Sequence, residues 1–240
     1  MIGHRASPAI TAAVDELYEE VDVPVPTVDH CVAPLGDLVG SYNLTCTELP
    51  NLTGEAAAEF LVQQGSIPEP PGDVTGEKLA GFLYATALHG SIFVEREDRI
   101  TRRRFSVAHE LGHYLLHFRR YLAGLPIDDT VVVGAIEALP LDEGDVDPSQ
   151  TSRGRLTLAQ AGTVTTHRLS HEQMEREADQ FAGELLMPAQ VVEGLVGRYT
   201  PDFRGGDLVW RLASDMLVSR AAMRWRLRDL GLMMPDGELV

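Results

Sequence analysis

Two histidines and a glutamate in the middle of the chain have the types and spacing of a metal site. The run is His109-Glu110-Leu111-Gly112-His113, an H-E-x-x-H motif. On a helix, residues four apart share one face with Cβ atoms about 6 Å apart, so both imidazoles could bind one ion at about 2.1 Å. Glu110 lies about 100° around the helix, where it could accept a proton from a water that the metal activates. The motif predicts His109 and His113 as ligands and Glu110 as the catalytic base.

The motif leaves a ligand missing, because a catalytic zinc takes three protein ligands and a structural zinc four. His117 lies about 12 Å along the axis from His109, so we expect it to support the site or to belong to the helix end. A second predicted helix carries Glu175 and Asp179 on one face. Glu175 could bind the metal while Asp179 holds a histidine ring from behind. Tyr114 and His117 are candidates for an oxyanion donor.

Three other residues compete for the third position. Glu177 lies about 200° around the helix from Glu175, so only one of the two can face the metal. We expect Glu177 to be an exposed charge on a solvated face. His167 and His171 lie before or at the start of this helix, where the chain could turn toward the site. The spacing alone leaves this choice open.

The two motifs together resemble a known family. The first reads R-R-R-F-S-V-A-H-E-L-G-H-Y-L-L-H at 102–117, and the second reads E-x-x-A-D-x-F-A-x-E-L-L-M-P at 175–188. They are similar to the motifs of the ImmA/IrrE family of metallopeptidases. The similarity extends over residues 92–120, 170–190 and 206–232, whereas the N-terminal third matches loosely.

The resemblance implies a zincin-like α+β fold, in which a small mixed sheet packs against the H-E-x-x-H helix and a second, ligand-bearing helix. It implies one zinc ion, for which Mn²⁺ could substitute, at the positions matching His109, His113 and Glu175. It also implies a zinc-dependent endopeptidase whose protein substrate is a helix-turn-helix transcriptional repressor in a stress-response or mobile-element switch. Glu110 would then pass the proton from water to the leaving amine.

The periodicity of the chain indicates which elements position these motifs. Apolar residues recur along the H-E-x-x-H segment at helical spacing, which predicts that one face of this helix is buried. Shorter apolar and β-branched stretches between turn residues predict strands. We expect helices over 7–21 and 54–64, extended structure over 33–48, strands at 81–84 and 91–94, an apolar helical stripe over 105–118, a helix from 170 to Pro188, and two short helices over 206–230.

The length of 240 residues allows one large domain with a small appendage. We expect a zincin-like metallopeptidase domain over residues 1–200. Within it, residues 122–168 lose their periodicity and contain an acidic run, which predicts an insertion. Residues 201–240 form the predicted C-terminal helical module.

This C-terminal module gives an alternative function. Residues 212–223 resemble a helix-turn-helix, in which Leu217 takes the turn position that glycine often fills. Arg220, Arg224, Arg226 and Arg228 add positive charge to its second helix, whose outward face could enter a DNA groove. The chain could therefore be a DNA-binding transcriptional regulator with a structural or sensory metal site.

The charge of the chain weakens this alternative. Lys and Arg number 20 against 36 Asp and Glu, a net charge of −16 that repels nucleic acid and anionic membranes. Residues 99–120 are the exception, with six arginines and one glutamate. We expect Arg99, Arg102, Arg103 and Arg104 either to pair with the acidic N-terminal third or to dock an acidic substrate segment.

We expect a cytoplasmic protein with no membrane partner. The N-terminus lacks the apolar stretch of a secretory signal, and no segment approaches the roughly 18 apolar residues of a membrane span. Cys31 and Cys46 are too few for a disulfide framework, which fits a reducing compartment. We expect both cysteines to be small buried side chains.

Overall fold

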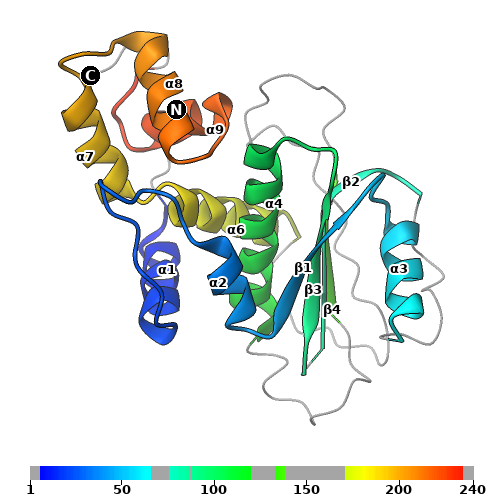
Figure 1. The fold of residues 1–240 in the computed structure, drawn as a ribbon. Coiled ribbons are helices and arrows are strands. Elements are labelled where there is room, and N and C mark those ends of the chain that lie inside the picture. The colour runs from blue at the N-terminus through cyan, green and yellow to red at the C-terminus, as the bar shows by residue number, and fades with distance from the viewer. Residues whose placement is uncertain (1–5, 66–75, 87, 120–132, 139–170, 235–240) are drawn as a thin grey trace.

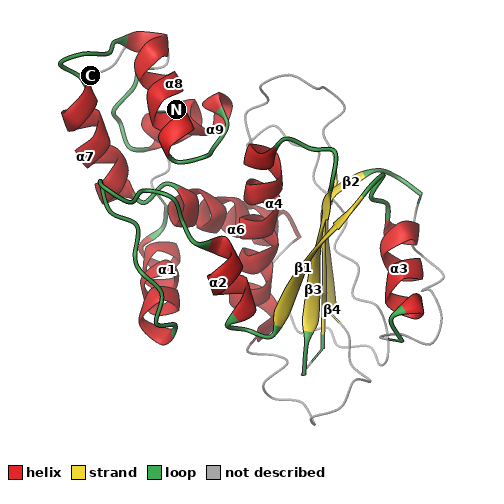
Figure 2. Ribbon diagram, viewed as in Figure 1, coloured by secondary structure: helices red, strands yellow, loops and turns green. Residues whose placement is uncertain are grey.

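The chain folds into a mixed sheet with helices on both faces (Figures 1 and 2). The computed structural model describes residues 6–65, 76–86, 88–119, 133–138 (backbone only) and 171–234. The combination of helices with a small sheet is as predicted. The elements are α1 (Pro8–Glu20), α2 (Leu35–Gly40), β1 (Leu44–Leu49), α3 (Gly54–Gln63), β2 (Leu79–Ala85), β3 (Gly90–Glu95), α4 (Ile100–His113), the π-helical turn η1 (Tyr114–Phe118), β4 (Val133–Ala138), α6 (His171–Leu186), α7 (Ala189–Tyr199), α8 (Gly205–Asp215) and α9 (Arg220–Asp229).

The sheet has the order β1-β3-β2-β4. Strand β3 is parallel to β1 and antiparallel to β2, which is itself antiparallel to β4. The strands predicted at 81–84 and 91–94 are confirmed as parts of β2 and β3. Strand β4 lies inside the predicted insertion 122–168. This part of the insertion therefore belongs to the sheet, because β4 pairs with β2. The other residues of that insertion lie outside the described ranges.

The central strand β3 is buried on both faces because its side chains alternate between two cores. Ile92 and Val94 point into the larger core, to which Leu111 of α4 also belongs. Phe93, between them, points into a smaller core together with Leu61 of α3. This alternation follows from the two-residue period of a strand. Helices α3 and α4 consequently lie on opposite faces of the sheet (Figure 1).

Helix α4 runs along one face of the sheet and carries the H-E-x-x-H motif. Its predicted apolar stripe is confirmed, since Ala108, Leu111 and Phe118 are completely buried. The helix is regular up to His113 and then widens into the π-helical turn η1. Such wide turns inside helices are rare and occur often at functional sites.

Helix α6 packs closely on α4 because the motif includes a glycine at the contact. A Cβ atom at Gly112 would lie 3.0 Å from Cδ1 of Phe181 on α6, which is closer than ordinary packing allows. Phe181 itself is completely buried. The absence of a side chain at Gly112 therefore sets the short distance between the two helices.

The C-terminal helices are anchored to α6. The two short helices predicted over 206–230 are confirmed as α8 and α9. Arg226 of α9 is completely buried, donates from Nε to the Met187 carbonyl at 2.9 Å, and pairs with the Glu184 carboxylate. The ring of Trp225 lies directly against Gly183. The predicted domain boundary at residue 201 stays a prediction.

Two sequence expectations need correction. The stretch 33–48 is not extended throughout, because α2 precedes β1 within it. Cys46 is exposed on β1, at the end of the strand order, and only Cys31 is partly buried. The β-formers of this stretch also fit a buried helix, which explains the first error. In the described part of the chain, no helix combines the length and the apolarity needed to cross a bilayer.

The buried ion pair of Arg226 gives a test of how the C-terminal helices are held. Arg226→Leu would leave the buried Glu184 carboxylate without its cation, so we expect the free energy of unfolding to fall by about 3–5 kcal/mol. Arg224→Leu is the matched control, because Arg224 is partly exposed and should change stability by less than about 0.5 kcal/mol. Urea unfolding measures both. Equal effects in the two variants would show that the Arg226 pair does not anchor α9.

Candidate metal centre

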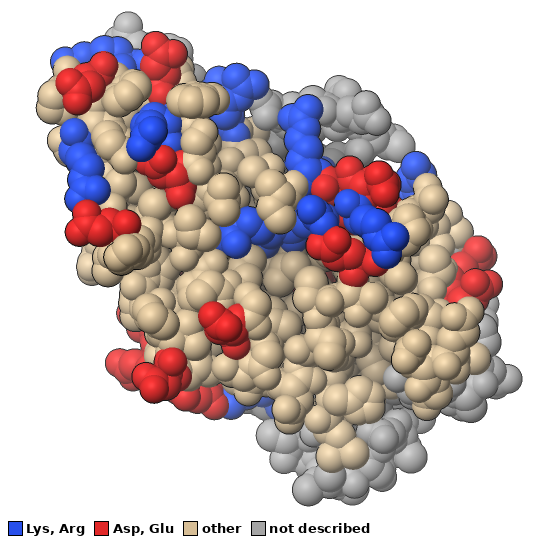
Figure 3. Space-filling model, viewed as in Figure 1, with Lys and Arg blue, Asp and Glu red and all other residues tan. Residues whose placement is uncertain are grey.

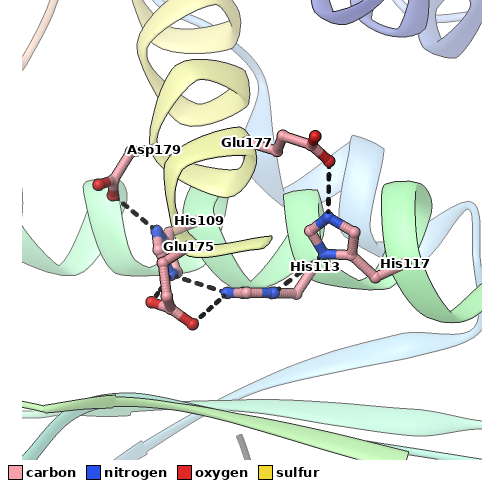
Figure 4. A network of polar contacts seen from close by, with 6 residues as sticks. All are labelled: His109, His113, His117, Glu175, Glu177 and Asp179. Atoms are coloured by element: carbon pink, nitrogen blue, oxygen red, sulfur yellow. Dashed lines mark hydrogen bonds and ion pairs between the residues drawn. The ribbon is translucent and has the colours of Figure 1, made fainter. Parts of the chain in front are cut away.

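Helices α4 and α6 bring two histidines and one carboxylate together (Figure 4). The Nε2 atoms of His109 and His113 are 3.0 Å apart. Glu175 extends from α6 to both rings, with carboxylate oxygens 3.5 Å from His109 Nε2 and 3.2 Å from His113 Nε2. All three side chains are buried. The predicted ligand set is thus assembled in one place from two helices far apart in the sequence.

The distances fit a small metal ion. In a tetrahedral zinc site with bonds of about 2.0–2.1 Å, neighbouring donor atoms lie about 3.3 Å apart. The three measured separations range from 3.0 to 3.5 Å. Among the described residues, His109, His113 and Glu175 form a group that could hold a metal ion. Two imidazoles and a carboxylate are donors that zinc accepts.

Asp179 determines which nitrogen of His109 carries the proton. Its carboxylate oxygen lies 3.0 Å from His109 Nδ1. A carboxylate only accepts hydrogen bonds, so Nδ1 donates, and the neutral ring keeps a bare lone pair on Nε2. This is the position predicted for Asp179, one helical turn beyond Glu175.

A second set of contacts determines the tautomer of His113. His113 Nδ1 lies 3.1 Å from Nδ1 of His117, whose Nε2 lies 3.2 Å from a carboxylate oxygen of Glu177. Because Glu177 accepts, His117 carries its proton on Nε2 and accepts at Nδ1. His113 must then donate from Nδ1 and keep Nε2 bare. The Nε2 lone pairs of His109 and His113 therefore face each other.

Burial favours the neutral, metal-binding form of His113. It lowers the pKa of this imidazole from 6.5 to about 3, because the charged ring would lose its hydration. Burial also acts to raise the pKa of Glu175, but the neighbouring His109 and His113 outweigh it and the pKa is lowered. Both groups are thus ready to coordinate a cation at neutral pH.

The remaining candidates lie in different places. Glu110 is completely buried beside His109 on α4. His117 supports His113 from behind, and with both ring nitrogens engaged it offers no N–H to a substrate oxygen. The Tyr114 ring packs 6.0 Å from that of Tyr42. The catalytic role of Glu110 and the oxyanion role of Tyr114 stay predictions.

The expectation for Glu177 was wrong. Its side chain is 29% exposed and contacts His117 instead of pointing into solvent. Helical geometry correctly separates it from Glu175, but a contact between side chains on two helices cannot be read from one helix alone. His167 and the side chain of His171 lie outside the described part of the chain.

The arginines before the motif have partners within the chain. Arg102 pairs with Asp98 at 2.9 Å, and Arg103 pairs with Glu48 at 2.5 Å. Arg104 donates to the Ala33 carbonyl at 3.0 Å. Of these contacts, Arg103–Glu48 is the expected ion pair with the acidic N-terminal third. Arg104 contacts a carbonyl in that third, and Arg102 pairs with a neighbour one helical turn away.

Residues 72–129 match a family model described as the IrrE N-terminal-like domain, a peptidase domain. The match covers about a quarter of the chain and includes β2, β3 and the whole H-E-x-x-H helix. It confirms the resemblance to the ImmA/IrrE family and indicates a metallopeptidase. No curated protein matches the chain.

The lowered pKa of His113 predicts how the metal-free protein responds to acid. Between pH 6.5 and about 3 the unfolded chain binds a proton at His113 that the folded chain excludes, so stability falls as the pH falls. The lowered pKa of Glu175 acts in the same direction. We expect His113 to contribute at most about 1.4 kcal/mol per pH unit to this loss.

Urea unfolding of chelator-treated protein between about pH 7 and about pH 4.5 measures this dependence. His113→Phe should make the slope shallower, whereas His30→Phe, at an exposed position, should leave it unchanged. An unaltered slope in His113→Phe would contradict the pKa assignment.

Proposed function

We propose that this chain is a zinc-dependent endopeptidase with a zincin-like fold. The observation that carries the proposal is the convergence of three donor atoms, from His109, His113 and Glu175, in a buried site beside Glu110. If these three donors of the described residues were its protein ligands, a zinc ion would keep a position for water or substrate, as in catalytic zinc sites. The peptidase-domain match over residues 72–129 supports the same proposal.

The chain's own residues would divide the reaction between them. A zinc ion held at this site would supply Lewis acidity toward water and a peptide carbonyl. Glu110 would accept the proton of the attacking water and deliver it to the leaving amine, which requires it to be ionised first and protonated later. Asp179 and His117 would keep the two imidazoles in the correct tautomer throughout.

We propose a transcriptional repressor with a helix-turn-helix domain as the protein substrate, cleaved in the cytoplasm. This substrate class follows from the resemblance to the ImmA/IrrE family. The C-terminal helices α7–α9 would contribute to substrate recognition, because they are attached to α6 through Arg226 and Trp225. Cleavage would relieve repression in a stress-response or mobile-element switch.

Glu110→Gln separates metal binding from hydrolysis. The amide cannot accept a proton, so we expect cleavage at least about 100-fold slower, with zinc binding unchanged because Glu110 is not among the three donors. The assay follows purified repressors encoded next to this gene by gel electrophoresis. Glu16→Gln, at an exposed position on α1, is the control. Undiminished cleavage by Glu110→Gln would exclude Glu110 as the base.

DNA binding through α8 and α9 is a second candidate function. Leu217, between these helices, has a φ of 52°, the left-handed conformation for which a helix-turn-helix often uses glycine. However, Met223, Arg226 and Leu227 of α9 are buried. On the face shown in Figure 3, Lys and Arg lie intermixed with Asp and Glu and form no continuous basic surface. The charge distribution therefore favours the peptidase.

A gel-shift titration against salt distinguishes the two functions. A DNA-binding regulator would show an affinity that falls steeply with salt, and Arg224→Ala would weaken it, because Arg224 is a partly exposed cation of α9. We expect no such shift with DNA from the neighbouring promoter. A steep salt dependence lost in Arg224→Ala would support the regulator instead.

A further inference from the structure

A relay of His117, Glu177 and Gln173 lies behind His113. Figure 4 shows the first two on the side of His113 away from the three donor atoms. His113 contacts His117 at 3.1 Å, and His117 contacts one carboxylate oxygen of Glu177 at 3.2 Å. The other oxygen of Glu177 accepts a hydrogen bond from Nε2 of Gln173 at 3.0 Å. Two members of this relay are on α6, so it joins the two ligand-bearing helices a second time.

For neutral histidine rings, the direction of each hydrogen bond in this relay follows from the groups at its end. The Gln173 amide nitrogen only donates, and the Glu177 carboxylate only accepts. His117 therefore donates from Nε2 to Glu177 and accepts at Nδ1. The single arrangement that satisfies all three contacts places the proton of His113 on Nδ1, which leaves Nε2 free for a cation.

The π-helical turn places His117 for this contact. The pairs His109–His113 and His113–His117 have the same spacing, but the first pair meets through Nε2 atoms and the second through Nδ1 atoms. The second pair spans the junction where α4 widens into η1. The rings of His113 and His117 are 5.1 Å apart at 54°, and His117 is buried. The π-helical turn therefore coincides with the change from an Nε2 contact to an Nδ1 contact. Through this Nδ1 contact, His117 lies behind His113 instead of beside the three donor atoms.

We propose that His117 and Glu177 are positioning residues for the metal ligand His113, with Glu177 acting through His117. Asp179 does the same for His109 by direct contact. The two histidine ligands would thus be oriented by two independent carboxylates on α6, one direct and one relayed. This inference depends on the proposed zinc site, and it adds a function for two residues that are not among its three donors.

The expected effect is on metal affinity. Removing the support behind a metal-binding histidine typically lowers metal affinity 10–100-fold. His117→Phe keeps a planar ring but has no acceptor, so we expect a loss in this range. His117→Asn places an acceptor oxygen near the position of Nδ1 and should retain most of the affinity. If His117 only filled space, the zinc affinity of His117→Phe would not be lower than that of His117→Asn.

The experiment measures zinc affinity by competition with a chromophoric chelator, for the wild type, His117→Phe, His117→Asn and the exposed control His30→Phe. We expect the control to equal the wild type. An affinity of His117→Phe equal to that of the wild type would overturn the inference and leave the zinc site intact. A wild type that binds no zinc would instead overturn the proposed function. An Asn variant as weak as the Phe variant would exclude the acceptor role.

A measurement on the unmutated protein keeps the inference testable even where a variant does not fold. Imidazole ¹⁵N chemical shifts distinguish a protonated from a bare ring nitrogen. In the zinc-loaded wild type we expect His117 to carry its proton on Nε2 and to have a bare Nδ1. A proton on Nδ1 of His117 would reverse the relay and overturn the inference.

Discussion

Two imidazoles and one carboxylate meet in a buried position between α4 and α6. The contact with Asp179 favours the tautomer of His109 that carries its proton on Nδ1. The relay through His117 favours the same tautomer of His113. In these tautomers the two Nε2 atoms, 3.0 Å apart with a carboxylate beside them, repel one another unless a cation neutralises them. The buried position strengthens this repulsion because water cannot screen it. The fold must therefore hold these groups together until a metal binds.

The packing around α6 supplies this restraint. Gly112 allows Phe181 to approach α4 closely, which brings Glu175 within reach of both imidazoles. On its far side, α6 is fixed by the buried pair of Glu184 with Arg226. Any movement of α6 would change both the third ligand and the two carboxylates that orient the histidines.

Local patterns were enough to predict the two histidine ligands and most of the helices, whereas the choice of Glu175 as the third ligand also needed the family resemblance. The i, i+4 spacing of His109 and His113 fixes their common face, and an apolar stripe fixes the burial of that face. The contact between His117 and Glu177 was not predictable in this way. It depends on a π-helical turn and on how two helices meet, and neither leaves a periodic signal. Strand β4 was likewise not predicted, because its stretch has no clear periodicity. Whether an edge segment forms a strand depends on its hydrogen bonds and packing with the neighbouring strand, here β2.

X-ray absorption at the zinc edge of the purified, zinc-loaded protein tests the central claim most directly. We expect one zinc per chain with only nitrogen and oxygen neighbours at about 2.0–2.1 Å, including the outer-sphere signature of two imidazoles. Glu175→Ala should reduce the imidazole contribution little while lowering the number of oxygen neighbours. Sulfur neighbours at about 2.3 Å, or a spectrum without imidazole, would contradict a site built from His109, His113 and Glu175.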